Sequence, residues 1–183
     1  IIGQLVNLFK GGEPVKMSKR TGELIELAEV IDEIGADATR YFLIEKKPDL
    51  HLDFDLDLAK KTSNENPVYY IQYAHARICT IIEKTNNLNT NNQTKNLTNE
   101  ERQLILQISR INDIIIDAAD TLEPYKIANY TYDLAKAFHS FYQTSPVIDN
   151  NTVIQHRYDT IQSTKEALVI CSNILGISTP EKM

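Results

Sequence analysis

Apolar residues recur at three- and four-residue steps along the C-terminal two thirds of the chain, the spacing that places them on one face of a helix. The first such segment, 66–84, begins with Asn66, a favourable N-cap, and Pro67, which suits the first helical position. Three more helices are predicted at 98–122, 124–144 and 152–175, joined by short or polar connections. Four long amphipathic helices of this kind form a bundle.

Each predicted helix has a stripe of residues that we expect to be buried. The second helix opens with a capping box at 98–101, the third is closed by Ser145 and Pro146, and the fourth ends at Gly176. The stripes are Val68, Ile71, His75, Ile78 and Ile82; Leu104, Ile108, Ile111, Ile115, Ala118 and Leu122; Ile127, Thr131, Leu134, Phe138 and Phe141; and Ile154, Tyr158, Ile161, Leu168 and Leu175.

The first third of the chain has shorter patterns. They predict a strand within residues 1–9, a glycine- and proline-rich turn at 10–14, a helix that ends at Gly35, and a helix at 38–45 capped by Asp37. Residues 49–57 alternate apolar and acidic side chains. A calcium loop would need a glycine at its bend and a late glutamate, so an extended segment is favoured, with Leu50, Leu52, Phe54 and Leu56 inward.

Asn, Thr, Gln and Lys make up almost all of residues 85–96, so we expect an exposed, mobile loop at 85–97 between two helices. No apolar run is long enough to span a membrane. Cys79 and Cys171 are far apart, which favours buried free thiols, and the four histidines lack metal-ligand spacing, so no metal site is expected. The chain also begins without a methionine, and we expect it to be cut from a larger protein.

The net charge of −6 argues against indiscriminate nucleic-acid binding but allows a local basic surface. Residues 60–84 hold four cations (Lys60, Lys61, Arg77 and Lys84) against two acids (Glu65 and Glu83), which predicts a positive edge.

Two stretches carry candidate chemistry. Tyr70, Tyr73 and Arg77 lie in one line on the first bundle helix, where phenol rings could stack on unpaired bases and the guanidinium could hold phosphate. The alternative is that the tyrosines are half-buried packing residues. Residues 15–22 carry three cations after a glycine pair, so this loop could close on a polyphosphate; the alternative is a solvated basic loop.

Residues 65–78 closely resemble a stretch typical of arginyl-tRNA synthetases, where it opens the helical domain that receives the tRNA anticodon. The resemblance implies that the tRNA contacts are Tyr69, Tyr70, Gln72, Tyr73 and Arg77.

Residues 16–20 are similar to the Lys-Met-Ser-Lys-Ser loop of class I aminoacyl-tRNA synthetases. The resemblance implies that Lys19 is catalytic, because the second lysine of that loop stabilises charge on the phosphates of ATP. The implied ATP-binding residues are Lys16, Met17, Ser18, Lys19 and Arg20. Arg20 departs from the serine of the family pattern.

Segments 37–42, 52–56, 123–142 and 175–183 also resemble arginyl-tRNA synthetases, so the likeness covers nearly the whole chain except the Asn-rich loop. It implies a mainly α fold. Residues 1–58 would be the end of a catalytic domain, with a short strand and loop, and residues 59–183 would be a DALR-type helical anticodon-binding domain.

The implied activity is ATP-dependent attachment of arginine to its tRNA, in a cytoplasmic, monomeric enzyme that uses ATP with Mg²⁺, L-arginine and tRNA(Arg). No His-x-Gly-His motif occurs in the sequence, so this chain alone is expected to be inactive. Two alternatives stay open. One is a non-catalytic tRNA- or protein-binding helical module; the other is part of a cysteinyl-tRNA synthetase, against which the absence of zinc-ligand cysteines counts.

We predict that Lys19→Ala in the full-length enzyme lowers the rate of arginine activation about 10²–10³-fold, because one charge-stabilising group is lost in the transition state. The affinity for tRNA should barely change. ATP–pyrophosphate exchange measures the activation rate, and a decrease of less than about threefold would exclude the phosphate role of Lys19.

Overall fold

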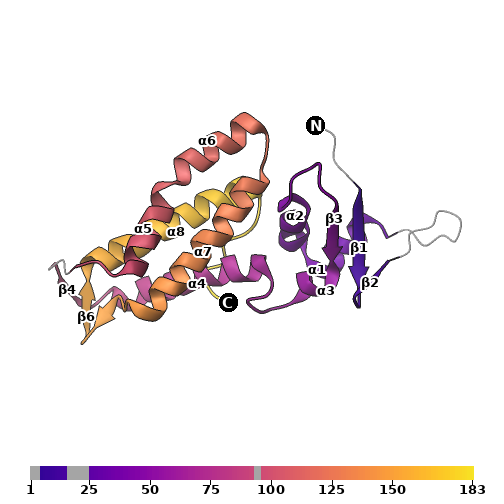
Figure 1. Cartoon of the computed structure of the whole chain (residues 1–183). Helices are drawn as coiled ribbons and strands as arrows, with labels where there is room; N and C mark the ends of the chain where they lie inside the picture. Colours follow the sequence, from indigo (N-terminus) through magenta and orange to yellow (C-terminus); the bar gives the residue numbers. More distant parts are fainter. Residues whose placement is uncertain (1–4, 16–24, 93–95) are drawn as a thin grey trace, which may run out of the picture.

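Two groups of elements follow one another along the chain and lie side by side (Figure 1). The computed structural model describes residues 5–15, 25–92 and 96–183. The first group, here called the N-terminal unit, consists of β1 (Val6–Lys10), β2 (Glu13–Pro14), α1 (Leu27–Ile34), α2 (Ala36–Ile44), β3 (Leu52–Asp55) and α3 (Leu56–Lys60). The second, the helical bundle, consists of α4 (Pro67–Thr85), β4 (Asn89–Asn91), α5 (Asn99–Ser109), α6 (Ile111–Thr121), α7 (Tyr125–Thr144), β5 (Ile148–Asp149), β6 (Thr152–Ile154) and α8 (Gln155–Leu175).

The N-terminal unit is built on a small sheet with the strand order β2-β1-β3. Strands β1 and β2 form a hairpin whose turn contains Gly11 and Gly12, both with positive φ, which glycine adopts without steric cost. Strand β3 runs parallel to β1, with Leu52 opposite Val6. The predicted strand near the start of the chain is therefore present over the described residues 6–10.

The extended segment predicted at 49–57 is shorter in the structure. Leu52, Phe54 and Leu56 are buried as expected, but the prediction for Leu50 was wrong, since this side chain is 56% exposed. Strand β3 begins only at Leu52, so Leu50 lies in the bend before it and does not share its alternation.

Gly35 separates α1 from α2. Its φ of 87° ends α1, as predicted, and the same residue is the N-cap of α2. The expectation that Asp37 caps α2 was wrong: the helix already begins at Ala36, and the Asp37 carboxylate accepts hydrogen bonds from Gln72 and Ser178 instead.

Helix α7 lies at the centre of the bundle and packs against α4, α5, α6 and α8. The buried stripe predicted for α7 is confirmed, and so is the mainly α architecture with its short strand-containing start. Side chains with no more than 1% exposure from α4, α5, α7 and α8 form the core: Ile71, Ile78, Leu104, Leu134, Phe138, Phe141, Ile161 and Leu168.

The segment 98–122 is two helices, and its prediction as one helix was wrong. The chain bends at Arg110, whose N–H bonds to the Gln107 carbonyl at 3.2 Å, and α6 then sets off in a new direction (Figure 1). Leu122 ends α6 in the left-handed conformation and is 61% exposed. The apolar spacing continues across the bend without a glycine or proline, so it does not reveal the change of direction.

A second small sheet stands at the far end of the bundle, with β6 between β4 and β5. Residues 89–91 form β4, which corrects the prediction of a loop throughout 85–97. Its pairing with β6 uses backbone groups and needs no apolar side chains, which explains why the Asn- and Thr-rich composition gives no sign of it. Thr152 lies in β6, so the last helix begins at Gln155 and not at Thr152 as predicted.

The predicted domain boundary between residues 58 and 59 falls inside α3. In the structure, residues 61–66 connect the N-terminal unit to α4. Within the described ranges, none of the helices has the length and apolar character needed to cross a membrane.

The start of α5 is fixed by a buried carboxylate. Thr98 and Glu101 form the predicted capping box, and the Glu101 carboxylate, only 2% exposed, also accepts hydrogen bonds from Arg157 and His156 on α8. Burial raises the pKa of Glu101, but the Thr98 N–H and the Arg157 guanidinium outweigh burial and hold it below the ordinary 4.5.

We predict that Glu101→Ala lowers the free energy of unfolding by about 3–5 kcal/mol, because it leaves Arg157 without its buried partner. Since the folded-state pKa of Glu101 is depressed, its contribution is complete above pH 4.5 and is lost as the pH falls further. Denaturant unfolding at several pH values should therefore show that the free energies of unfolding of the variant and the wild type become more similar below pH 4.5. The matched control is Glu166→Ala on an exposed face of α8, and an equal effect of both variants would contradict the role of the pair.

Candidate functional site

Helix α4 begins at a fixed point. The Asn66 side chain accepts hydrogen bonds from the N–H groups of Val68 and Tyr69, and its amide donates to the carbonyls of Ala59 and Lys61. Asn66 therefore caps α4, as predicted, and ties its first turn to the end of α3.

Half-buried aromatic residues of α4 and α7 meet along the edge of their shared core. Tyr70 lies 4.4 Å from His139 and 5.4 Å from Tyr132 between ring centroids. Tyr73 stacks on His139 at 5.5 Å and on Tyr69 at 6.3 Å. We call Tyr69, Tyr70, Tyr73 and Arg77 of α4, with Tyr132, His139 and Tyr142 of α7, the aromatic cluster.

Arg77 completes one end of the aromatic cluster. Its guanidinium carbon lies 4.6 Å from the centre of the Tyr142 ring, a cation–π contact. Among the described residues, no carboxylate lies within ion-pair distance of Arg77. A guanidinium placed over a ring, with no carboxylate partner, keeps N–H groups available for a phosphate.

Burial lowers the pKa of His139, and the nearby Arg77 lowers it further, although a hydrogen bond to the Tyr70 carbonyl opposes both effects. His139 is therefore a neutral ring at neutral pH. A neutral imidazole can stack on Tyr73 and pack against Tyr70 without the cost of burying a charge.

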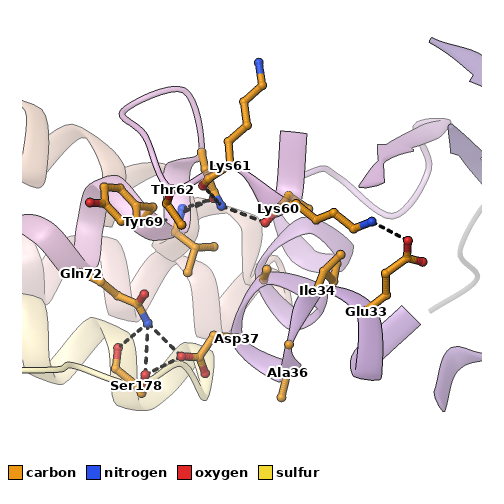
Figure 2. Close-up of a pocket in the computed structure, with 15 residues that line it drawn as sticks. Glu33, Ile34, Ala36, Asp37, Lys60, Lys61, Thr62, Tyr69, Gln72 and Ser178 are labelled. Carbon is orange, nitrogen blue, oxygen red and sulfur yellow. Dashed lines mark hydrogen bonds and ion pairs between the residues drawn. The ribbon is translucent and has the colours of Figure 1, made fainter. Parts of the chain in front are cut away.

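The sequence-predicted tRNA contacts separate into two groups. Tyr69, Tyr70, Tyr73 and Arg77 belong to the aromatic cluster, in which the α4 tyrosines pack on other rings and are half-buried. Gln72 points elsewhere: its amide donates to Asp37 and to Ser178 (Figure 2).

Sequence reasoning missed the α7 half of the aromatic cluster. Tyr132, His139 and Tyr142 flank the predicted buried stripe of α7, and the sequence does not show that this flank faces α4. Tyr132 and His139 are seven residues apart and His139 and Tyr142 three, and this helical spacing could have marked a second aromatic line.

The positive edge predicted for residues 60–84 is partly neutralised. Lys60 pairs with Glu33, and Lys61 pairs with Glu65. Arg77 and Lys84 are the cations of this segment that have no ion pair within the part of the chain that the structure describes.

The predicted ATP-binding residues Lys16, Met17, Ser18, Lys19 and Arg20 lie outside the described residues. In the chain order they come between β2 and α1 of the N-terminal unit. Across residues 5–15, 25–92 and 96–183, no cluster of three or more His, Cys, Asp or Glu side chains is placed to hold a metal ion.

Comparison with known proteins identifies the family to which this helical bundle belongs. Residues 71–183 match the model of the DALR anticodon binding domain. The chain is 46% identical over 187 residues to an arginine–tRNA ligase of Shouchella clausii and 44% identical over 187 residues to that of Oceanobacillus iheyensis. Each match covers 98% of this chain and 34% of the relative, so the chain spans about a third of the length of these relatives.

Solved structures show the same arrangement. A Campylobacter jejuni protein described as an arginyl-tRNA synthetase aligns with a TM-score of 0.86 and 32% identity, over 100% of this chain and 40% of that one. The Thermus thermophilus arginyl-tRNA synthetase aligns with a TM-score of 0.72 over 90% of this chain and 29% of that one; at 24% identity it supports the fold alone.

We predict that the stability of the wild-type chain falls relative to His139→Phe as the pH drops below 6.5. The folded-state pKa of His139 is depressed, so its neutral form stabilises the fold above the unfolded value of 6.5, and protonation favours unfolding below it. Phenylalanine keeps a ring between Tyr70 and Tyr73 but cannot take up a proton. Denaturant unfolding of both proteins between neutral and mildly acidic pH provides the test, and a pH-independent difference would contradict the neutral, buried ring.

Proposed function

Because the chain belongs to the family of DALR anticodon-binding domains, we propose that it is the tRNA-binding part of an arginine–tRNA ligase, together with the loop that contacts ATP. In the full-length enzyme, arginine and ATP would give arginyl-adenylate, and the terminal ribose of the tRNA would then take the arginine. The named relatives support this proposal, since they are arginine–tRNA ligases matched across 98% of this chain.

The observation that carries the tRNA-binding role is Arg77. In the described chain its guanidinium rests on Tyr142 without a carboxylate partner, beside a row of half-buried rings. Unstacked anticodon bases can rest on Tyr69, Tyr70 and Tyr73, and a neighbouring phosphate can pair with Arg77. Tyr132, His139 and Tyr142 extend this surface on α7, whereas Gln72 is assigned to a structural contact.

Lys19 would stabilise the charge that develops on the phosphates of ATP, with Lys16, Met17, Ser18 and Arg20 beside it in the loop. ATP, with Mg²⁺, and L-arginine are the proposed small substrates, and tRNA(Arg) is the proposed macromolecular one. We place the monomeric enzyme in the cytoplasm. The alternatives of a non-catalytic helical module and of a cysteinyl-tRNA synthetase are not favoured, because the matched relatives are arginine ligases along the N-terminal unit and the bundle alike.

We predict that Tyr73→Ala weakens the binding of arginine-accepting tRNA by about 1–3 kcal/mol, the value of one base stack. Arg77→Ala should weaken binding and reduce the salt dependence by about one phosphate contact. Fluorescence titration at several salt concentrations measures both effects. Because Tyr73 is half-buried and loses contacts with Tyr69 and His139, affinity is expressed per folded molecule, with the folded fraction taken from the melting curve.

Matched controls are Tyr158→Ala, a half-buried tyrosine on α8, and Arg102→Ala, an exposed arginine on α5. Tyr158→Ala should lower the stability of the fold but leave the affinity for tRNA unchanged. Arg102→Ala should leave the salt dependence of tRNA binding unchanged. If Tyr73→Ala and Arg77→Ala behave like these controls, the aromatic cluster is a packing feature and the tRNA-binding assignment is wrong.

A further inference from the structure

Three segments that are far apart in the sequence meet at the Asp37 carboxylate (Figure 2). The Gln72 amide of α4 donates to Asp37 Oδ2 at 2.8 Å, and the Ser178 hydroxyl of the C-terminal segment donates to the same oxygen. The Gln72 amide also lies 3.2 Å from the Ser178 carbonyl oxygen. We call Asp37, Gln72 and Ser178 the latch.

The C-terminal segment around the latch is anchored on both sides. The Pro180 carbonyl lies 2.9 Å from Nδ1 of His75 on α4, and Ile177 is buried. On the other side, Gly176 has a φ of 68°, which strains other residues, and a Cβ atom there would lie 3.0 Å from the Arg40 side chain of α2, closer than an ordinary contact. The segment is thus wedged between α2 of the N-terminal unit and α4 of the bundle.

Direct packing between the two units is interrupted beside the latch. A cleft of about 580 Å³ lies there, lined by the α1–α2 junction, the end of α3 and the first turns of α4, including Tyr69 (Figure 2). Elsewhere, the Tyr41 hydroxyl donates to the Ala128 carbonyl at 3.2 Å, and Lys47 pairs with Glu123. These polar contacts act in addition to the buried apolar core, which is continuous across both units.

We propose that the latch fixes the orientation of the N-terminal unit relative to the bundle, and that Asp37, Gln72 and Ser178 are positioning residues for aminoacylation. This inference rests on the proposed function. Gln72 and Tyr73 are neighbours on α4, so one helix carries both the latch and the aromatic cluster. The latch thereby holds the unit that contains the ATP loop at a set angle to a tRNA bound on the cluster.

The contact between positions 37 and 72 can be broken and restored by exchanging two groups. Gln72→Glu places a second carboxylate against Asp37 and the Ser178 carbonyl oxygen and is repelled by both. The double variant Asp37→Asn with Gln72→Glu returns one amide and one carboxylate to the 37–72 pair but not the donation to the Ser178 carbonyl. Spin labels at Asp32→Cys on α1 and Ser163→Cys on α8, in a Cys79→Ser background, report the distance between the units in the 183-residue chain. Cys171 is fully buried and out of reach of the label.

The expected result is a broadened distance distribution in Gln72→Glu and a narrower distribution, closer to that of the wild type, in the double variant. If Gln72→Glu has the same distance distribution as the wild type, the proposed role of the latch is wrong. Gln162→Ala, which removes a glutamine that bonds only to Tyr158 in the described chain, is the matched control and should leave the distances unchanged.

In the full-length ligase, Gln72→Glu should lower kcat for aminoacylation about 10- to 100-fold, the effect of a small misplacement of reacting groups. The Kd for tRNA should change less than about threefold, because the aromatic cluster is intact, and the double variant should recover much of the lost kcat. A loss of tRNA affinity with unchanged kcat would overturn the positioning role. A wild-type enzyme that fails to charge tRNA with arginine would overturn the proposed function, and the distances in the isolated chain would still decide the latch.

Discussion

Helix α7 packs against the four other helices of the bundle, and Leu134, Phe138 and Phe141 are completely removed from solvent. Replacing one such phenylalanine by alanine typically costs about 3–5 kcal/mol, because the cavity cannot collapse fully. With the apolar stripe held in this way, the rotation of α7 about its axis is fixed, and the residues flanking the stripe must lie at its edges. Tyr132, His139 and Tyr142 are half-buried for that reason. The aromatic cluster is a consequence of core packing, which also keeps its rings in place before any ligand arrives.

Electrostatics on this chain are local. The net charge is −6, and some of the described charged side chains are matched in pairs such as Lys10–Glu33 and Lys126–Asp117, whose partly exposed positions make each pair worth little. Screening at physiological salt acts over about 8 Å, so distant carboxylates repel an anion at Arg77 only weakly. The electrostatic environment of Arg77 is therefore set mainly by its immediate neighbours. The Tyr142 ring attracts the guanidinium and does not occupy its N–H groups.

The sequence pattern could predict the helices whose apolar residues recur at a helical spacing and whose ends are marked by local capping residues. Asn66-Pro67, the Thr98 capping box and Gly176 are local signals, and each marks a helix end in the structure. The failures involve interactions that are not local. The bend at Arg110 preserves the apolar spacing. Strand β4 forms by backbone pairing with a strand some 60 residues away. The Asp37 carboxylate accepts hydrogen bonds from Gln72 and Ser178 and does not cap α2. The same holds for the site: the α4 tyrosines are visible in the sequence, but their partners on α7 are known only once the two helices are packed.

The covalent link between the two units and the non-covalent contacts between them restrict different motions. Residues 61–66 form a short link, and Asn66 shortens it further by bonding to the carbonyls of Ala59 and Lys61, so α3 and α4 cannot move far apart. A short link limits translation but leaves rotation about it comparatively free, because few backbone dihedrals need to change. Contacts away from the link restrict rotation most effectively, since they act on a longer lever arm. The Tyr41 hydroxyl and the Lys47–Glu123 pair are such contacts, whereas the latch lies beside the link. Together they bring residues 37–47 against parts of the chain that follow later in the sequence.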